Sequence, residues 1–196
     1  MRTGMPLDRS RIVEAAALLV DEQGLEGFTL AKLATRLGIR SQSIYAHVDG
    51  LDSLRRELAL LSLDDLARRL GRAAMGRTGR NALQALAEAH AGFAAEHFGL
   101  YSCSLRRPDG DDELAHRIND VTLPWHAVLT SFGLRPSEII HYHRALWAAI
   151  HGFVTLRHQG LMTRAASPDR SFSLMIEVFA DALEGRRNFP IEGGHS

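Results

Sequence analysis

The feature that most constrains the fold is an apolar pattern at helical spacing in residues 28–54, interrupted once by a glycine. Thr29 can cap the first helix of this stretch, and Gly38 can adopt the left-handed conformation that ends it. A second short helix, over residues 40–47, then follows a sharp turn. The apolar residues on one face of the first helix are Leu30, Leu33, Ala34 and Leu37. We therefore expect a helix-turn-helix.

The second helix of this motif is polar at its N-terminal end. Ser41, Gln42 and Ser43 are small or polar, and Ile44 is the inward anchor. A helix that enters the DNA major groove presents such residues to the base edges. Gln42 can form two hydrogen bonds to adenine, and Arg40, where it reaches inward, can do the same to guanine. These residues favour DNA binding.

The rest of the chain is also expected to be helical. It has 196 residues, of which 45% are hydrophobic, and only 6 are prolines, so an all-α protein with a substantial core is predicted. No apolar run approaches the roughly 18 residues of a membrane-spanning helix, and the N-terminus lacks the apolar core of a signal peptide. We therefore expect no membrane partner. The single cysteine, Cys103, cannot form an internal disulfide, which indicates a reducing, cytoplasmic location.

Breaks between the later helices are predicted from glycine and proline. A long helix begins near residue 52, residues 71–80 form a loop, and residues 81–98 return to helix. The segment 99–112 is expected to be a break. The helix after it is expected to be interrupted or kinked near Pro124.

The last two helices carry more apolar surface than one chain can cover. Residues 145–156 are apolar around nearly the whole helix, and the final helix has two apolar faces. Two faces require two neighbouring elements. A homodimer through the last two helices, packed as a four-helix bundle about a two-fold axis, meets this requirement. The first face carries Phe172, Met175, Ile176, Phe179 and Leu183, and the second carries Leu174, Val178 and Ala182.

The order of the N-terminal motifs is specific. An opening helix, the corner GLEGFT, then LAKLATRLGI and SIYAHV resemble the DNA-binding domain of the TetR family of bacterial transcription regulators over residues 8–58. The resemblance implies that Tyr45 and His47 contact the DNA backbone, which suits a phenol hydroxyl and an imidazole N–H as donors to phosphate. It places the base-reading positions on Ser41, Gln42 and Ser43. The predicted DNA-binding residues are Thr29, Lys32, Arg40, Ser41, Gln42, Ser43, Tyr45 and His47.

Three features bear on how strongly one copy would hold DNA. The chain has 23 basic and 23 acidic residues, so its net charge is zero. Family members often have serine or threonine where Arg40 stands, and lysine where Leu51 stands. Leu51 cannot bind phosphate, which weakens non-specific binding and flattens its salt dependence.

The resemblance also implies a small-molecule effector in the C-terminal helices, which shifts the paired recognition helices relative to successive major grooves about 34 Å apart. Aromatic walls with a few polar groups are typical of such pockets. The predicted effector-binding residues are Phe93, His97, Tyr101, Trp125, His126, Trp147 and His151. The stretch WAAIHGFVTLRHQG, residues 147–160, resembles the Trp-His-Gly subgroup of TetR C-terminal domains.

Motifs of catalysis and metal binding are missing from the sequence. It contains no HExxH, paired CxxC, glycine-rich phosphate loop or GxSxG. His143 and His151 lie two helical turns apart, too far to bind one ion without another helix. We predict no catalytic residue, no cofactor and no metal site.

We thus expect an all-α protein with a three-helix helix-turn-helix DNA-binding domain, residues 1–54, and a helical ligand-binding and dimerisation domain, residues 55–196. Its predicted function is that of a ligand-responsive repressor, a homodimer on a palindromic double-stranded operator, and not an enzyme. Two alternatives stay open. One is a helical small-molecule or metal-binding protein, possibly enzymatic, with a degenerate helix-turn-helix. The other is a helix-turn-helix that docks protein instead of DNA. For Tyr45 alone, the alternative to a DNA contact is a ring packed against the first helix.

Overall fold

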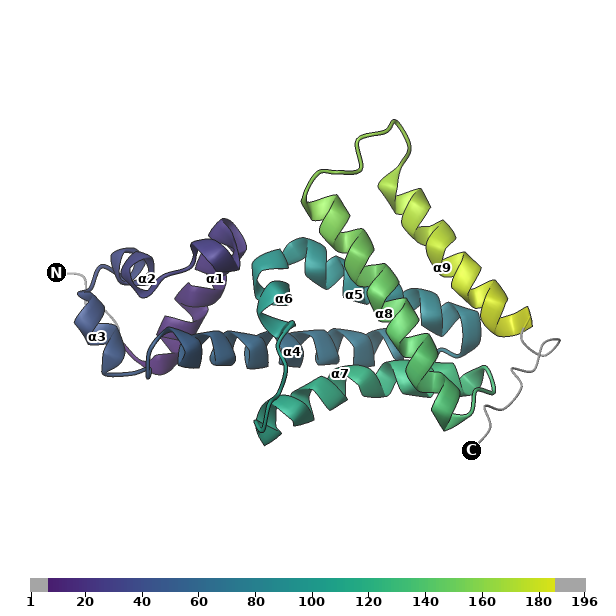
Figure 1. The fold of residues 1–196 in the computed structure, drawn as a ribbon, viewed down its shortest axis with the longest axis horizontal. Coiled ribbons are helices and arrows are strands. Elements are labelled where there is room, and N and C mark those ends of the chain that lie inside the picture. The colour runs from purple at the N-terminus through teal and green to yellow at the C-terminus, as the bar shows by residue number, and fades with distance from the viewer. Residues whose placement is uncertain (1–6, 186–196) are drawn as a thin grey trace. The chain divides into compact units, whose positions relative to one another are not determined.

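The computed structural model describes residues 7–185, and every regular element within that range is an α-helix (Figure 1). The N-terminal helices are α1 (Arg9–Gly27), α2 (Leu30–Leu37), α3 (Ser41–Tyr45) and α4 (Leu51–Ala74). The later helices are α5 (Gly79–Glu96), α6 (Phe98–Ser104), α7 (Asp112–Ser131), α8 (Pro136–His158) and α9 (Pro168–Gly185). The prediction of an all-α protein is confirmed. No helix in the described part is both long and apolar enough to cross a membrane.

The described chain forms two compact units. The first comprises the residues up to Leu66 together with Glu96–Asp120, and the second comprises Ala67–Ala95 together with the residues from Val121 onwards. The predicted division between residues 54 and 55 separates a DNA-binding part from a ligand-binding part by function. It stays a prediction.

Helix ends in the first unit follow local sequence signals. The Asp8 carboxylate accepts a hydrogen bond from the Arg11 amide at 2.9 Å, and the Thr29 hydroxyl accepts one from the Lys32 amide at 3.3 Å. Gly38 has φ 69° and ends α2 in the left-handed conformation. The helix ends predicted at Thr29 and Gly38 are confirmed. Side chains of this unit with no exposed surface include Ile12, Ala16, Val20, Leu33, Ile44, Leu54 and Leu58.

The predicted break over residues 99–112 is wrong in its first half, because α6 forms there. The Asp21 carboxylate of α1 accepts a hydrogen bond at 2.8 Å from the amide of Leu100, in the first turn of α6. Gly99 allows α6 to lie directly against α1, since a Cβ at this position would stand 1.9 Å from the carbonyl oxygen of Val20. A contact between segments far apart in the sequence thus stabilises a helix that local pattern does not predict.

Two other predicted boundaries need correction. The loop expected over residues 71–80 is shorter, because α4 extends to Ala74 and α5 begins at Gly79. Helix α7 is a single element that contains Pro124, so it is not interrupted there, and the alternative of a kink at Pro124 stays a prediction.

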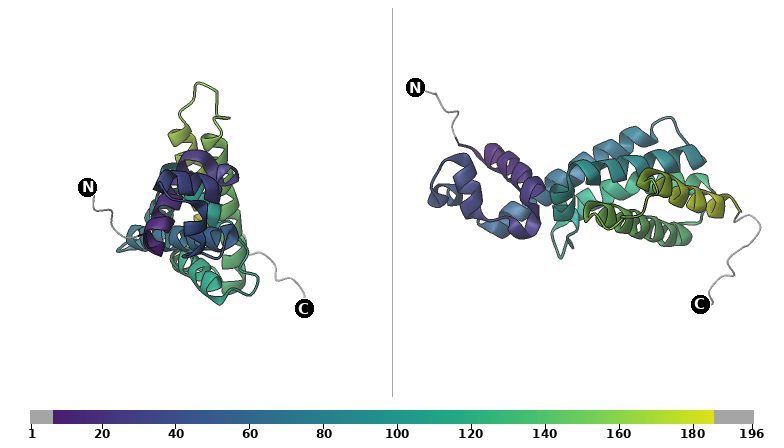
Figure 2. Two further views of the ribbon diagram at one scale, coloured as in Figure 1. Left: turned by 90° about the vertical axis from the view of Figure 1, so that its left-hand side faces the viewer. Right: turned by 90° about the horizontal axis from the view of Figure 1, so that it is seen from above.

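The second unit packs α5, α8 and α9 with the adjoining parts of α4 and α7. Helices α8 and α9 lie side by side (Figures 1 and 2), and their inner faces meet through the rings of Phe153 and Phe172, whose centroids are 5.0 Å apart. The Ser167 hydroxyl accepts a hydrogen bond from the Arg170 amide at 3.3 Å at the start of α9. Side chains of this unit with no exposed surface include Leu70, Leu83, Leu86, Phe93, Leu129, Leu146 and Ile150.

Candidate functional site

The outward face of α3 is the first candidate site. Ser41, Gln42 and Ser43 are all exposed in its first turn, whereas Ile44 is fully buried. Tyr45 is 59% exposed, so the alternative in which its ring packs against the first helix is wrong. One buried anchor thus fixes a short helix and leaves its polar residues on the surface.

The ends of α3 differ slightly from the expected range of residues 40–47. Arg40 precedes the helix in an extended conformation, with φ −78° and ψ 144°, and its side chain forms no capping hydrogen bond. Arg40 is exposed, and His47, beyond the last helical residue, is half-buried. Both therefore lie in the turns that flank α3 and not within the helix.

Basic side chains near α3 have partners within the chain. The Lys32 ammonium donates a hydrogen bond to the carbonyl oxygen of Gly27 at 2.7 Å. The Arg36 guanidinium binds both oxygens of Glu22, at 2.5 and 2.9 Å, and this lowers the pKa of the Glu22 carboxyl below its usual value. A phosphate that approached Arg36 would have to compete with this carboxylate. The sequence showed the positive residues of this region but not their partners.

A cluster of aromatic and imidazole rings lies inside the second unit. The Trp125 ring is 6.2 Å from the ring of His90 and 6.3 Å from that of His143, and the His143 ring is 5.2 Å from that of His126. Burial lowers the pKa of His90 to about 4, with a further contribution from the charges of His143 and His151. Burial and His126 likewise lower the pKa of His143 to about 4. Both imidazoles are therefore neutral at pH 7.

The predicted effector-binding residues are divided between the two compact units. His97 and Tyr101 belong to the first unit, where the Nδ1 atom of His97 is 2.7 Å from an Asp21 carboxylate oxygen and Tyr101 is buried. Phe93 and Trp125 are buried in the second unit, and His126 and His151 are half-buried there. Trp147 is 48% exposed on α8.

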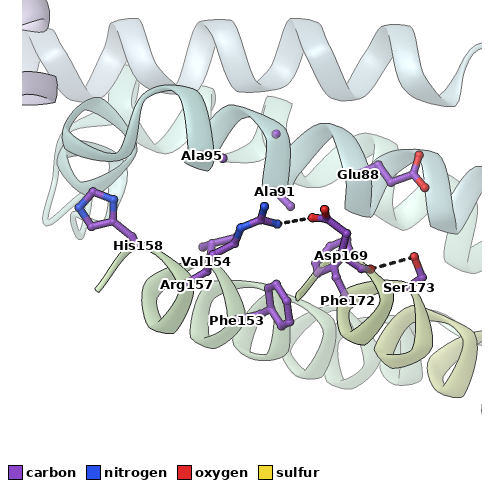
Figure 3. Close-up of a pocket in the computed structure, with 11 residues that line it drawn as sticks. Glu88, Ala91, Ala95, Phe153, Val154, Arg157, His158, Asp169, Phe172 and Ser173 are labelled. Carbon is purple, nitrogen blue, oxygen red and sulfur yellow. Dashed lines mark hydrogen bonds and ion pairs between the residues drawn. The ribbon is translucent and has the colours of Figure 1, made fainter. Parts of the chain in front are cut away.

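A cavity of about 500 Å³ lies between α5, α8 and α9, and none of the seven predicted residues lines it (Figure 3). Its walls combine small residues from α5, aromatic and charged residues from the end of α8, and the first turns of α9. The lining residues are Glu88, Ala91, Gly92, Ala95, Phe153, Val154, Arg157, His158, Asp169, Phe172 and Ser173. This cavity could not be predicted from the sequence, because the small residues of α5 have the pattern of an ordinary helix face.

One ion pair joins two of the residues that line this cavity. The Arg157 guanidinium, in the last turn of α8, lies 2.5 Å from a carboxylate oxygen of Asp169 at the start of α9 (Figure 3). The Arg157 side chain is 46% exposed and that of Asp169 is 77% exposed. Within the described residues, no group of three or more histidine, cysteine, aspartate or glutamate side chains is arranged to hold a metal ion.

Comparison with known proteins agrees with this architecture. The family described as "Tetracyclin repressor-like, C-terminal domain" matches residues 83–179. The chain is 35% identical to an uncharacterized HTH-type transcriptional regulator of Mycobacterium tuberculosis, over 92% of this chain and 83% of that protein. It is 30% identical to the uncharacterized HTH-type transcriptional regulator YobS of Bacillus subtilis, over 90% of this chain and 93% of that protein.

A solved structure of similar fold is a TetR variant from Acinetobacter baumannii in complex with minocycline. The TM-score is 0.70 at 21% identity, over 93% of this chain and 99% of that one. The Trp-His-Gly subgroup suggested by residues 147–160 stays a prediction. The relatives that match along nearly the whole chain, the C-terminal domain match and the shared fold lead to one conclusion: this chain belongs to the TetR family of DNA-binding, helix-turn-helix transcription regulators.

Proposed function

We propose that the protein is a ligand-responsive repressor that binds a palindromic operator as a homodimer. The observation that carries this proposal is the surface of α3, where Ser41, Gln42 and Ser43 are exposed around the fully buried Ile44. Such a helix can enter a major groove without disturbing the core beneath it. The protein then acts by binding and not by catalysis.

The proposed DNA contacts divide into two kinds. Gln42 and the two flanking serines read base edges, because their amide and hydroxyl groups can donate and accept hydrogen bonds there. Tyr45, His47, Arg40 and Lys32 hold the sugar-phosphate backbone and set the register of the helix. Thr29 supports the motif from its position at the start of α2, where its hydroxyl caps the helix.

Fluorescence anisotropy with a DNA fragment from upstream of the protein's own gene tests these roles, beside a scrambled fragment of equal composition. Tyr45→Phe removes one phosphate donor, and we expect it to weaken binding to both fragments about 3- to 10-fold. Gln42→Ala should cost about 1–3 kcal/mol on the operator fragment alone. Gln84→Ala, an exposed glutamine on α5, is the matched control.

Equal affinity for the two fragments at every salt concentration would contradict the proposal. If both fragments bind weakly and neither Tyr45→Phe nor Gln42→Ala changes that binding, the helix-turn-helix serves as a surface for protein, as in the alternative above.

The homodimer is supported by apolar side chains on the outer faces of α8 and α9. Trp147 is 48%, Leu174 52% and Val178 60% exposed, although the helices already pack against each other through their inner faces. Leu174 and Val178 are four residues apart and so share one helical face. A second copy of α8 and α9 would cover this surface in a four-helix bundle.

Light scattering coupled to gel filtration tests the dimer. The wild-type protein should elute with twice the chain mass of 21.6 kDa. Val178→Asp places a charge on the proposed interface, and we expect a monomer at micromolar concentration. Leu123→Asp, at a leucine of α7 that is 53% exposed, should remain dimeric. A monomeric wild type at micromolar concentration would refute the proposed assembly.

The proposed effector binds within the C-terminal helices. The structural relative from Acinetobacter baumannii holds a small molecule, minocycline, which supports a small-molecule effector for a protein of this fold. The cavity between α5, α8 and α9 offers such a molecule about 500 Å³, a volume within the range of ligand sites.

A further inference from the structure

We propose that the cavity between α5, α8 and α9 binds an amphipathic anion, a carboxylate joined to a flat apolar body, and that Arg157 holds the carboxylate. This inference rests on the proposed function, because it names the chemical class and the binding site of the effector. It also predicts which intramolecular contact the effector replaces.

The shape of the cavity selects an apolar body. Ala91, Gly92 and Ala95 form the α5 wall and have little or no side chain, so the backbone of α5 can be approached closely. The rings of Phe153 and Phe172 form the opposite wall, with centroids 5.0 Å apart in an edge-to-face arrangement (Figure 3). A slot between small residues and phenyl rings suits an aromatic ring or a short alkyl chain.

The charged residues of the lining select an anion. Arg157 is paired with Asp169, but the Asp169 side chain is 77% exposed and the Arg157 side chain only 46%. An exposed ion pair contributes little to stability. Asp169 can therefore return to water at small cost while the guanidinium stays at the cavity, where a ligand carboxylate can bind it through two hydrogen bonds.

The other ionisable residues of the lining are consistent with this choice. His158 follows Arg157 at the end of α8 and brings no acidic group to the lining. Glu88 accepts a hydrogen bond from the Gln84 amide at 2.9 Å, and its carboxylate points away from Arg157 in Figure 3. The cationic end of the cavity is thus separate from its one acidic residue on α5.

Binding in this way would alter the connection between α8 and α9. Arg157 lies in the last turn of α8, and Asp169 lies in the first turn of α9. Their ion pair joins the two ends of the intervening segment, residues 159–167. A ligand carboxylate that replaces Asp169 releases this connection between the two helices that carry the proposed dimer surface.

The first experiment measures ligand charge preference by isothermal titration calorimetry on the full-length protein. The probes 4-phenylbutyrate, 4-phenylbutan-1-ol and 4-phenylbutylamine share one apolar body and differ in the polar end. We expect the butyrate to bind at least about 10-fold more tightly than the alcohol, and the amine to bind weakest. Amine binding equal to or tighter than butyrate binding would overturn the anion assignment, as would no butyrate binding at millimolar concentration.

Substitutions at the ion pair give opposite results if the proposal is correct. Arg157→Ala should weaken butyrate binding about 10-fold and abolish its advantage over the alcohol. Asp169→Asn removes the competitor and should strengthen butyrate binding, a gain that general damage to the cavity would not produce. Arg170→Ala is the matched control, because this exposed arginine of α9 pairs with Glu177 and does not line the cavity. Weaker binding in Asp169→Asn would contradict the exchange.

A blocking variant tests the location. A Cβ at Gly92 would meet no atom within 4 Å, and Gly92 lies inside α5, so Gly92→Leu can fill the cavity without a backbone clash. We expect it to abolish binding of all three probes. Gly71→Leu, at a similarly open helical glycine of α4 outside the cavity, should bind them normally. Unchanged binding in a folded Gly92→Leu protein would place the site elsewhere.

Operator binding by the same wild-type protein separates the two proposals. If operator DNA binds specifically and the butyrate does not bind, the effector assignment fails and the repressor function stands. If the butyrate binds with the expected variant pattern and no specific DNA binding occurs, the anion site stands and the repressor function fails.

Discussion

Acidification should destabilise this protein through His90 between about pH 6.5 and pH 4. The side chain is only 3% exposed, and burial lowers its pKa from an ordinary value of 6.5 to about 4. Between these two values the unfolded chain binds a proton that the folded chain does not. The free energy of unfolding is therefore highest above pH 6.5 and falls as the pH is lowered towards 4.

The size of the effect follows from the two pKa values. Each unit of difference corresponds to about 1.4 kcal/mol, so a shift from 6.5 to about 4 removes about 3 kcal/mol once the pH lies below both values. At pH 4.5 most of this loss has occurred. His143, whose pKa is also lowered to about 4, acts in the same direction, so the effect of His90 alone is a lower limit for the pair. For a domain of ordinary stability this is a large fraction of the total.

Urea unfolding at pH 7 and pH 4.5, at one fixed protein concentration, measures the effect. In His90→Leu the difference in unfolding free energy between the two pH values should be smaller than in the wild type by about 2–3 kcal/mol. His141→Leu, at an exposed histidine of α8, should keep the wild-type difference. The same pH difference in His90→Leu and in the wild type would refute the assignment of this proton to His90.

Two further substitutions test the attachment of α6. Gly99→Ala would place a Cβ 1.9 Å from the carbonyl oxygen of Val20, so we expect a loss of at least about 1–3 kcal/mol in thermal unfolding, whereas Gly71→Ala, in open space on α4, should raise stability by up to about 1 kcal/mol. Asp21→Ala removes the acceptor of the Leu100 amide and should cost about 1–2 kcal/mol; amide hydrogen exchange should rise in α6 first, and unchanged exchange there would contradict this role.

The parts of the fold that could be predicted from sequence are those set by neighbouring residues. Thr29 and Gly38 each act on atoms within a few positions, so residue type alone indicated these helix ends. Helix α6 could not be predicted in this way, because it depends on Asp21 and on the close approach at Gly99, nearly 80 residues apart in sequence.

The candidate sites show the same limit. The exposed face of α3 follows from one apolar anchor among polar residues, which sequence displays directly. The effector-binding residues could not be predicted in this way. Helical spacing shows that Phe93 and Tyr101 each face inward, but it does not show which neighbours they contact. The structure places these two residues in different compact units. The cavity lies where Gly92 of α5 has no side chain. The residues of the opposite wall, on α8 and α9, follow Gly92 by 60 or more positions in the sequence.

The local charge pattern explains why the proposed dimer matters for DNA binding. Lys32 and Arg36 already have partners within the chain, and Leu51 supplies no charge at the start of α4. Each phosphate contact that is missing or must be exchanged lowers affinity and its salt dependence, so one copy of α3 should hold DNA weakly.

Two linked copies raise affinity through effective concentration, but only when their spacing fits the operator. Affinity then depends on how α8 and α9 pack, and the ion pair of Arg157 with Asp169 connects those two helices. An anion that breaks this pair would change how the two copies of α3 are aligned. Because each copy alone binds DNA weakly, operator affinity depends on that alignment.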